Sequence, residues 1–186
     1  VIEIDSNNKK IDSGLKRFIT YDSLSEFSFH ISGPLMMVYW LRDLKFDYIE
    51  LAILINVSQV LGLFSMRYWG KRIDNNGSYS TIRFTSFCIG IFPMFWVGIY
   101  YLPNELILAG SIIIASLASL MFSGRALALD NRLYEHMKNK KMIKVTSKRF
   151  FFRGLSIFIG GLIGGLLTRN ESSLSNYIEL DTVIHA

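Results

Sequence analysis

The polar residues with the clearest chemical potential lie inside long apolar runs of this sequence. His30 is the one histidine within such a run. An ionisable side chain is costly to bury in a membrane, so its presence there indicates a functional role by default. Histidine changes charge near neutral pH, which would suit proton transfer. The alternative is that His30, close to the start of its run, simply forms a hydrogen bond near a membrane surface.

Two other sets of polar side chains share helix faces. Asn56 and Gln59 are three residues apart, so on a helix they lie on one face. Ser116 and Ser119 have the same spacing, and Ser123 continues their line. Each set could line a solute cavity. Alternatively, each set packs or forms hydrogen bonds between helices, as small and polar residues commonly do in membranes.

These side chains must be positioned by helices that cross a membrane. Residues 84–104 and 106–124 contain no charged side chain, and a run of about 18 such residues is long enough to span the hydrocarbon layer. The sequence therefore predicts an all-α integral membrane protein with five transmembrane helices. We expect these spans at residues 24–41, 48–68, 84–102, 106–124 and 151–168. Residues 1–23 are predicted to form a cytoplasmic linker or an amphipathic surface helix, and residues 169–186 a polar tail.

Basic residues alternate between the two sides of this arrangement. Of the 20 Lys and Arg, 17 lie in the N-terminal segment and in the second and fourth connections, and 3 lie elsewhere. Positively charged loops stay in the cytoplasm, so the N-terminal segment is predicted to be cytoplasmic. The expected surroundings are the lipid bilayer of the plasma membrane. Residues 138–149 are basic and contain no acid, and they either touch anionic lipid heads or only set the topology.

The last apolar run is rich in glycine. Gly160, Gly161, Gly164 and Gly165 form two overlapping G-x-x-x-G pairs. Such pairs let two helix backbones approach closely in a membrane. We expect these glycines to pack helices together rather than to bind a solute directly.

A polar stretch at residues 69–78 separates the second and third runs. Gly70, Asp74 and Gly77 read G-x-x-x-D-x-x-G, and Arg83 follows. Glycine lets the chain turn sharply, with positive φ where needed. An aspartate can accept hydrogen bonds from the free N–H groups at a helix start. We expect a short cytoplasmic turn here, with an ordinary solvated acid as the alternative interpretation of Asp74.

This turn resembles the signature loop of the major facilitator superfamily, G-x-L-x-D-R-x-G-R-R/K. Asn75 stands where that family has Arg, Ser78 and Tyr79 replace the basic pair, and Arg83 supplies a charge slightly later. Residues 160–165 are similar to the family's G-P-x-x-G-G stretch, with glycine where proline is usual. The resemblance covers about residues 15–168. It implies a carrier of two six-helix halves, with this chain as helices seven to eleven and the other half as a missing partner.

The resemblance also implies a function. The chain would be part of a secondary active transporter that moves a small solute by alternating access, with proton coupling as an option. The first and fourth spans would face its cavity, and Asp74 would contact a helix of the other half. The alternative is a non-transporting membrane scaffold or a decayed half-carrier.

Several other classes of function find no support in the residues. The sequence has no nucleotide-binding glycine-rich loop, no paired metal ligands and no nucleophile elbow, so we expect neither an enzyme nor a cofactor or metal. Cys88 is the single cysteine, which leaves no internal disulfide. The net charge of +5 is unevenly distributed, which makes nucleic acid an unsuitable partner. The chain starts at Val1, and we expect it to be a fragment of a longer protein.

Overall fold

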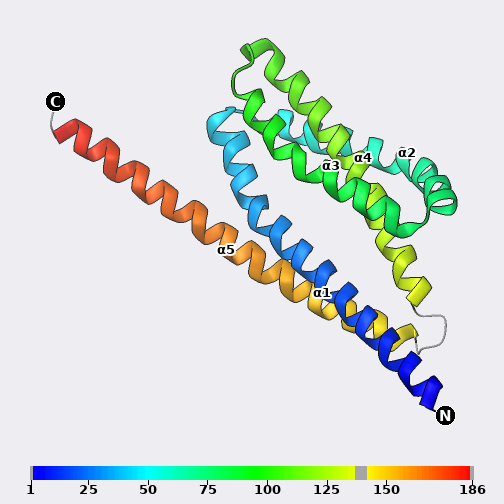
Figure 1. Ribbon diagram of the computed structural model, residues 1–186. Coiled ribbons are helices and arrows are strands. Elements are labelled where there is room, and N and C mark those ends of the chain that lie inside the picture. The colour runs from blue at the N-terminus through cyan, green and yellow to red at the C-terminus, as the bar shows by residue number, and fades with distance from the viewer. Residues whose placement is uncertain (1, 137–141, 185–186) are drawn as a thin grey trace. The chain divides into compact units, whose positions relative to one another are not determined.

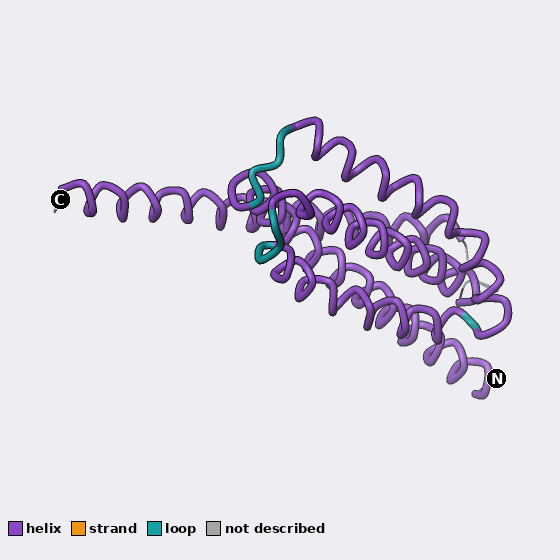
Figure 2. The backbone as a smooth tube through the Cα atoms, turned by 90° about the horizontal axis from the view of Figure 1, so that it is seen from above, coloured by secondary structure: helices purple, strands orange, loops and turns teal. Residues whose placement is uncertain are grey.

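The structure of the protein is a computed structural model that describes residues 2–136 and 142–184. These residues are almost entirely helical and contain no strand, which confirms the predicted all-α fold for the described part of the chain. Five α-helices and one π-helical turn follow one another with short connections (Figure 1, Figure 2). They are α1 (Ile2–Val38), η1 (Tyr39–Asp43), α2 (Tyr48–Asn76), α3 (Ser78–Ile99), α4 (Asn104–His136) and α5 (Met142–Ile184).

Local sequence accounts for the breaks between the helices. Asp47 caps α2, because its side chain accepts a hydrogen bond from the Glu50 N–H while the Glu50 side chain accepts one from the Asp47 N–H. Pro103 precedes the first residue of α4, and the residue before or at a proline rarely continues a helix. Leu44 and Phe46 are buried in the loop ahead of the cap, which fixes the entry of the chain into α2.

The predicted ten-residue turn at residues 69–78 is wrong in its extent. Helix α2 continues through Gly70 and Asp74 to Asn76, so Gly77 is the one non-helical residue between α2 and α3. Gly77 has φ 80°, which favours glycine, whereas Gly70 has ordinary helical neighbours on both sides. A single glycine with positive φ is enough to reverse the chain. Asp74 therefore lies in the last turn of a helix rather than at a helix start.

The two predicted terminal segments are both helical in the structure. Residues 2–23, predicted as a cytoplasmic linker or an amphipathic surface helix, form the first part of α1, which continues through Pro34 to Val38. Residues 169–184, predicted as a polar tail, form the last part of α5. Neither stretch contains a proline, and the tail has no glycine, so nothing in the local sequence stops either helix. The basic connection is shared between α4 and α5, and residues 137–141 lie outside the described residues.

Among the described residues, four helices are long and apolar enough to cross a membrane. They are α2, α3, α4 over Asn104–Glu135, and α5 over Ile143–Arg169. Only 11–22% of the most apolar stretch of each is buried within the chain, so most of these surfaces face lipid or other protein. These helices contain the expected spans at residues 48–68, 84–102, 106–124 and 151–168. Helix α1 is not in this group, because polar side chains such as Asp22, Glu26 and His30 interrupt its apolar residues.

The chain divides into two compact units. In one unit, α1 and α5 lie side by side, as Figure 1 shows. In the other unit, α4 packs against both α2 and α3. Ser78 meets Glu135 at one end of the α3–α4 pair and Ile99 lies against Gly110 at the other, so these two helices are antiparallel.

Candidate functional site: the charged seam between α1 and α5

The contact line between α1 and α5, here called the α1–α5 seam, is the candidate functional site. Asp22, Glu26 and His30 are spaced four residues apart on α1, which places them on one helix face. Arg149 and Arg153 have the same spacing on α5. Asp22 meets Arg149 and Glu26 meets Arg153, so residue numbers rise together on both helices and the helices run parallel.

The first ion pair of the seam is fully enclosed. The Nε atom of Arg149 donates to Oδ2 of Asp22 at 2.7 Å, and the two side chains are 3% and 0% exposed. The Arg149 guanidinium also lies 5.6 Å from the centre of the Phe18 ring. The other carboxylate oxygen of Asp22 is buried and has no hydrogen-bond partner among the described residues. A buried pair of this kind holds its partners strongly, because losing either one leaves an uncompensated charge.

The second ion pair is reachable from outside the seam. Nη2 of Arg153 lies 2.9 Å from Oε1 of Glu26, and the Arg153 side chain is 32% exposed. His30 lies one turn further along α1, with its Nδ1 atom 3.7 Å from Oε2 of Glu26 and its side chain 40% exposed. One carboxylate thus contacts both an arginine and a histidine. Arg153 and His30 are thus more exposed than the enclosed Asp22–Arg149 pair.

The histidine tautomer follows from its hydrogen bond. Nδ1 of His30 lies 2.8 Å from the backbone oxygen of Glu26. A carbonyl oxygen can only accept, so Nδ1 carries the hydrogen and donates it. In the neutral ring, Nε2 is then the atom that is available to take up a proton. His30 thus lies beside the seam and hydrogen-bonds the backbone of its own helix, and both of its interpretations stay predictions.

Glycines bring the two helices together beyond the ion pairs. A methyl group added at Gly160 would lie 2.7 Å from the backbone oxygen of Phe27, and one added at Gly164 would collide with the backbone oxygen of Ile31. Gly161 and Gly165 have nothing within 4 Å at the same position, so they face away from α1. The structure thus uses one G-x-x-x-G pair of the two for close helix contact. The seam therefore holds ion pairs at one end and close contacts between the two helix backbones at the other.

A second seam, between α2 and α4, holds the expected serine face. A methyl group at Gly62 would lie 2.5 Å from Oγ of Ser119 and 2.8 Å from Oγ of Ser123, so these small residues pack closely. Ser116 is also buried, and its hydroxyl has no hydrogen-bond partner in the described part of the chain. Trp69 closes this seam: its ring lies against Gly124. These contacts are those of helix packing within the unit.

Trp69 is the largest buried side chain of the protein that sequence reasoning missed, since it was placed in the polar turn. Its indole N–H donates to the backbone oxygen of Leu120 at 2.8 Å, and its side chain is 2% exposed. Phe84 lies beside it, and the Arg72 guanidinium lies 4.5 Å from the centre of the Phe84 ring. The signal for this position was the helical spacing of Trp69 from Gly62 and Leu54 on a continuous α2.

The remaining candidates lie on exposed surfaces. Asn56 and Gln59 are exposed, and the Asn56 side chain donates to the backbone oxygen of Ala52 at 2.7 Å. Asp74 is exposed at the end of α2, and Arg83 is exposed on α3 with its guanidinium 5.8 Å from the centre of the Tyr79 ring.

Sequence reasoning also missed the arginine partners of the seam. Arg149 was interpreted as a lipid contact or a topology signal and Arg153 as a topology signal, and Asp22 was assigned to a linker or surface helix. The four-residue spacing of the acids on one helix and of the arginines on another was the available signal. No group of histidine, cysteine and acidic side chains that could hold a metal ion occurs among the described residues.

Comparisons of the chain with protein-family profiles, with curated proteins and with solved structures found no match. The functional interpretation therefore rests on the residues and contacts described above.

Proposed function

We propose that this protein takes part in membrane transport, as a portion of a secondary carrier that moves a small solute by alternating access. The observation that carries this proposal is the Glu26 carboxylate, which contacts Arg153 and His30 on partly exposed sides of the α1–α5 seam. Ionisable groups that pair with one another between membrane helices commonly mark ion and proton pathways. The four long apolar helices and the resemblance of residues 69–78 to the major facilitator signature loop support the same proposal.

The chemistry of the seam suggests proton coupling. A proton taken up by Glu26 removes the charge that attracts Arg153, and a proton taken up at Nε2 of His30 adds a charge that attracts Glu26. The strength of the contact between α1 and α5 would then depend on protonation at this point. Alternating access needs a contact of this type, because two arrangements of the helices must differ in stability by a small and controllable amount. The enclosed Asp22–Arg149 pair would hold α1 and α5 together in both arrangements of the helices.

The wider proposal follows the resemblance. The spans correspond to helices seven to eleven, the N-terminal segment is cytoplasmic, the membrane is the plasma membrane, and another half completes the carrier. No catalytic activity is proposed.

Uptake by vesicles tests this proposal. Membrane vesicles from cells that express the protein are given radiolabelled sugars, amino acids and organic cations, with and without an imposed proton gradient, and vesicles without the protein are the control. We expect gradient-dependent uptake of one solute class, and at least a tenfold loss in Glu26→Gln and in His30→Ala. Uptake that both variants leave unchanged contradicts the role of the seam. A complete lack of uptake in vesicles that also contain the other half of the carrier contradicts transport.

A non-transporting membrane scaffold is the second candidate, because Asp74 and Gly70 lie inside a continuous α2 instead of in an open turn. A carrier that uses this loop as a gate would lose uptake in Asp74→Asn. A scaffold would show no uptake at all, and Asp74→Asn would leave its amount in the membrane unchanged.

A further inference from the structure

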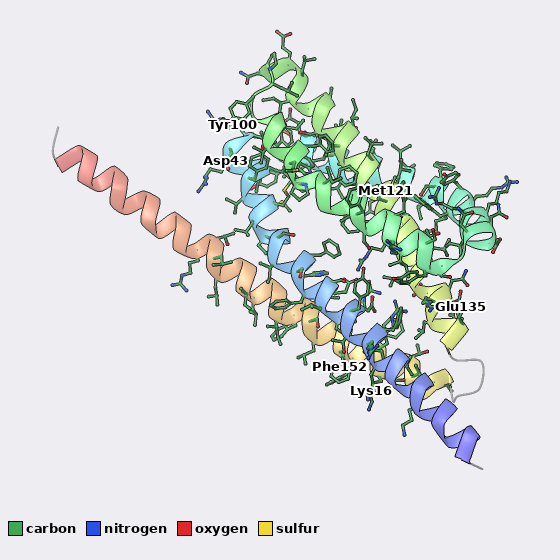
Figure 3. The ribbon with its side chains drawn as sticks, in the orientation of Figure 1. Lys16, Asp43, Tyr100, Met121, Glu135 and Phe152 are labelled. Atoms are coloured by element: carbon green, nitrogen blue, oxygen red, sulfur yellow. The ribbon has the colours of Figure 1, made fainter. Side chains whose placement is uncertain are left out.

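An open groove of about 480 Å³ runs along the α1–α5 seam on the side of Lys16 and Phe152, which Figure 3 shows close together. Lys16 lies at one end of it, and Lys148 lies level with Asp22, about one and a half helical turns further along. Leu24, Phe27 and Phe152 form its apolar wall. Hydroxyl groups lie between them, and the full lining is Lys16, Ile19, Thr20, Ser23, Leu24, Phe27, Lys148, Phe152 and Ser156.

The order of these residues along the helices gives the groove a direction. Because α1 and α5 run parallel, Lys16 and Lys148 lie toward the N-terminal end of both helices, and Phe27 and Ser156 lie further along both. Eleven residues separate Lys16 from Phe27, which at the rise of a helix is about 16 Å. The groove therefore changes from cationic to apolar over a distance that matches a lipid headgroup, its glycerol and the upper part of one acyl chain.

Among the residues whose side chains the structure describes, no acidic group lines the groove. The neighbouring Asp22 is already paired with Arg149. Lys16 and Lys148 are both exposed, and the Lys148 ammonium group lies 6.0 Å from the centre of the Phe152 ring. An anion held there would have two ammonium groups, and a chain attached to it would lie against Leu24, Phe27 and Phe152.

We propose that this groove binds an anionic phospholipid, with the phosphate at Lys16 and Lys148 and one acyl chain along Leu24, Phe27 and Phe152. The site is independent of the proposed transport function, and it would be present in a scaffold as well as in a carrier. Zwitterionic lipids satisfy the apolar part alone, because their headgroup carries its own compensating cation. A basic residue near the membrane surface contributes about 1 kcal/mol toward anionic lipid, or about fivefold in affinity.

Photocrosslinking tests the site directly. The full chain is reconstituted in nanodiscs that contain traces of phosphatidylglycerol or of phosphatidylcholine, each with a diazirine in its acyl chain. Crosslinked peptides are then identified by mass spectrometry. We expect phosphatidylglycerol to label peptides that contain Phe27 and Phe152 at least fivefold more than phosphatidylcholine does. Peptides from the exposed side of α2, around Leu63, should show no such preference.

Charge variants identify the headgroup contacts. Lys16→Gln and Lys148→Gln should each reduce the preference for phosphatidylglycerol about fivefold. The matched control is Lys71→Gln with Lys144→Gln, which removes two exposed lysines outside the groove and should change the preference less than twofold. Neither groove lysine takes part in the ion pairs of the seam, so we expect the thermal unfolding of the variants to match the wild type. The crosslink map of the wild type remains decisive if a variant fails to fold.

Three results would overturn the proposal. Equal labelling of the groove by both lipids would show ordinary contact with acyl chains. A preference for phosphatidylglycerol that survives both lysine substitutions would show that the headgroup lies elsewhere. Efficient disulfide formation between two copies carrying Ser156→Cys, in a Cys88→Ser background, would show that protein and not lipid covers the groove.

Discussion

The α1–α5 seam and the α2–α4 seam both bring helices together through glycine, but they differ in what the glycines face. Gly160 and Gly164 meet the backbone of α1, whereas Gly62 and Gly124 meet the side chains of serines and of Trp69. The α1–α5 seam also contains two carboxylate–arginine pairs, one enclosed and one partly exposed. Buried ion pairs are a weak source of stability compared with apolar packing. Their presence in the α1–α5 seam therefore suggests that this seam serves a purpose beyond holding helices together.

Removing one partner of the enclosed Asp22–Arg149 pair should lower the free energy of unfolding more than any other change to the two seams. Arg149→Met leaves the Asp22 carboxylate buried without its partner, and we expect a loss of about 3–5 kcal/mol in the free energy of unfolding. The double variant Asp22→Leu with Arg149→Met removes both charges and should regain most of this loss. Titration of mixed micelles with a denaturing detergent measures both values. A double variant no more stable than the single one would contradict an ion pair whose main cost is desolvation.

Glycine substitutions should have the next largest effect on the free energy of unfolding, and this effect should differ between the two seams. Gly164→Ala forces a methyl group into the Ile31 backbone and should cost about 1–3 kcal/mol. Gly165→Ala is the control, since nothing lies within 4 Å, and it should be neutral. Gly62→Ala should cost less than Gly164→Ala, because the Ser119 and Ser123 hydroxyls can rotate away and a backbone cannot. The same unfolding titration measures these costs. A larger loss in Gly62→Ala than in Gly164→Ala would show that the helices of the α1–α5 seam separate more easily than those of the α2–α4 seam.

The single-residue connection between α2 and α3 gives a smaller effect. Gly77→Ala places a side chain at φ 80° and should cost about 1–2 kcal/mol in unfolding free energy. Gly70→Ala lies inside α2 with open space around it and should be neutral or slightly stabilising. A large loss at Gly70 would instead favour the open turn predicted from the sequence.

The indole hydrogen bond of the α2–α4 seam should give the smallest change. Trp69→Phe keeps an aromatic ring but loses the bond to the Leu120 oxygen, which is worth about 0.5–1.5 kcal/mol. Trp40→Phe serves as the matched tryptophan control outside this seam. Native tryptophan fluorescence followed during thermal unfolding measures the difference. An unchanged transition in Trp69→Phe would mean that the oxygen of Leu120 is satisfied in another way.

Local sequence predicted the helices and their breaks well, because uncharged runs, Pro103 and Gly77 act over a few residues. It failed where packing decides. Residues 69–76 read as a turn by composition, yet they continue α2 because Trp69 is buried against α4. The seam was missed because its two acids and two arginines lie more than 120 residues apart, at 127 for the first pair. Asp22 and Glu26 make α1 less hydrophobic, and only the pairing of α1 with α5 shows that arginines neutralise their charges.

The parallel pairing of α1 and α5 has a consequence for topology. Glycines well inside the apolar part of α5 contact Phe27 and Ile31 of α1, so α1 is matched to α5 at the same depth. We therefore expect α1 to cross the membrane in the same direction as α5, which an odd number of spans requires. This crossing is the central claim, since a seam outside the membrane would have no reason to couple protons to transport.

Cysteine accessibility tests that claim most directly. In a Cys88→Ser background, single cysteines at Arg17, Tyr48, Lys71 and Tyr101 are treated with a membrane-impermeant maleimide, in sealed vesicles of known orientation; each of these positions is exposed. We predict that Arg17→Cys and Lys71→Cys react from the cytoplasmic side, and that Tyr48→Cys and Tyr101→Cys react from the opposite side. If Arg17→Cys and Tyr48→Cys react from the same side, α1 does not cross the membrane and the account is wrong.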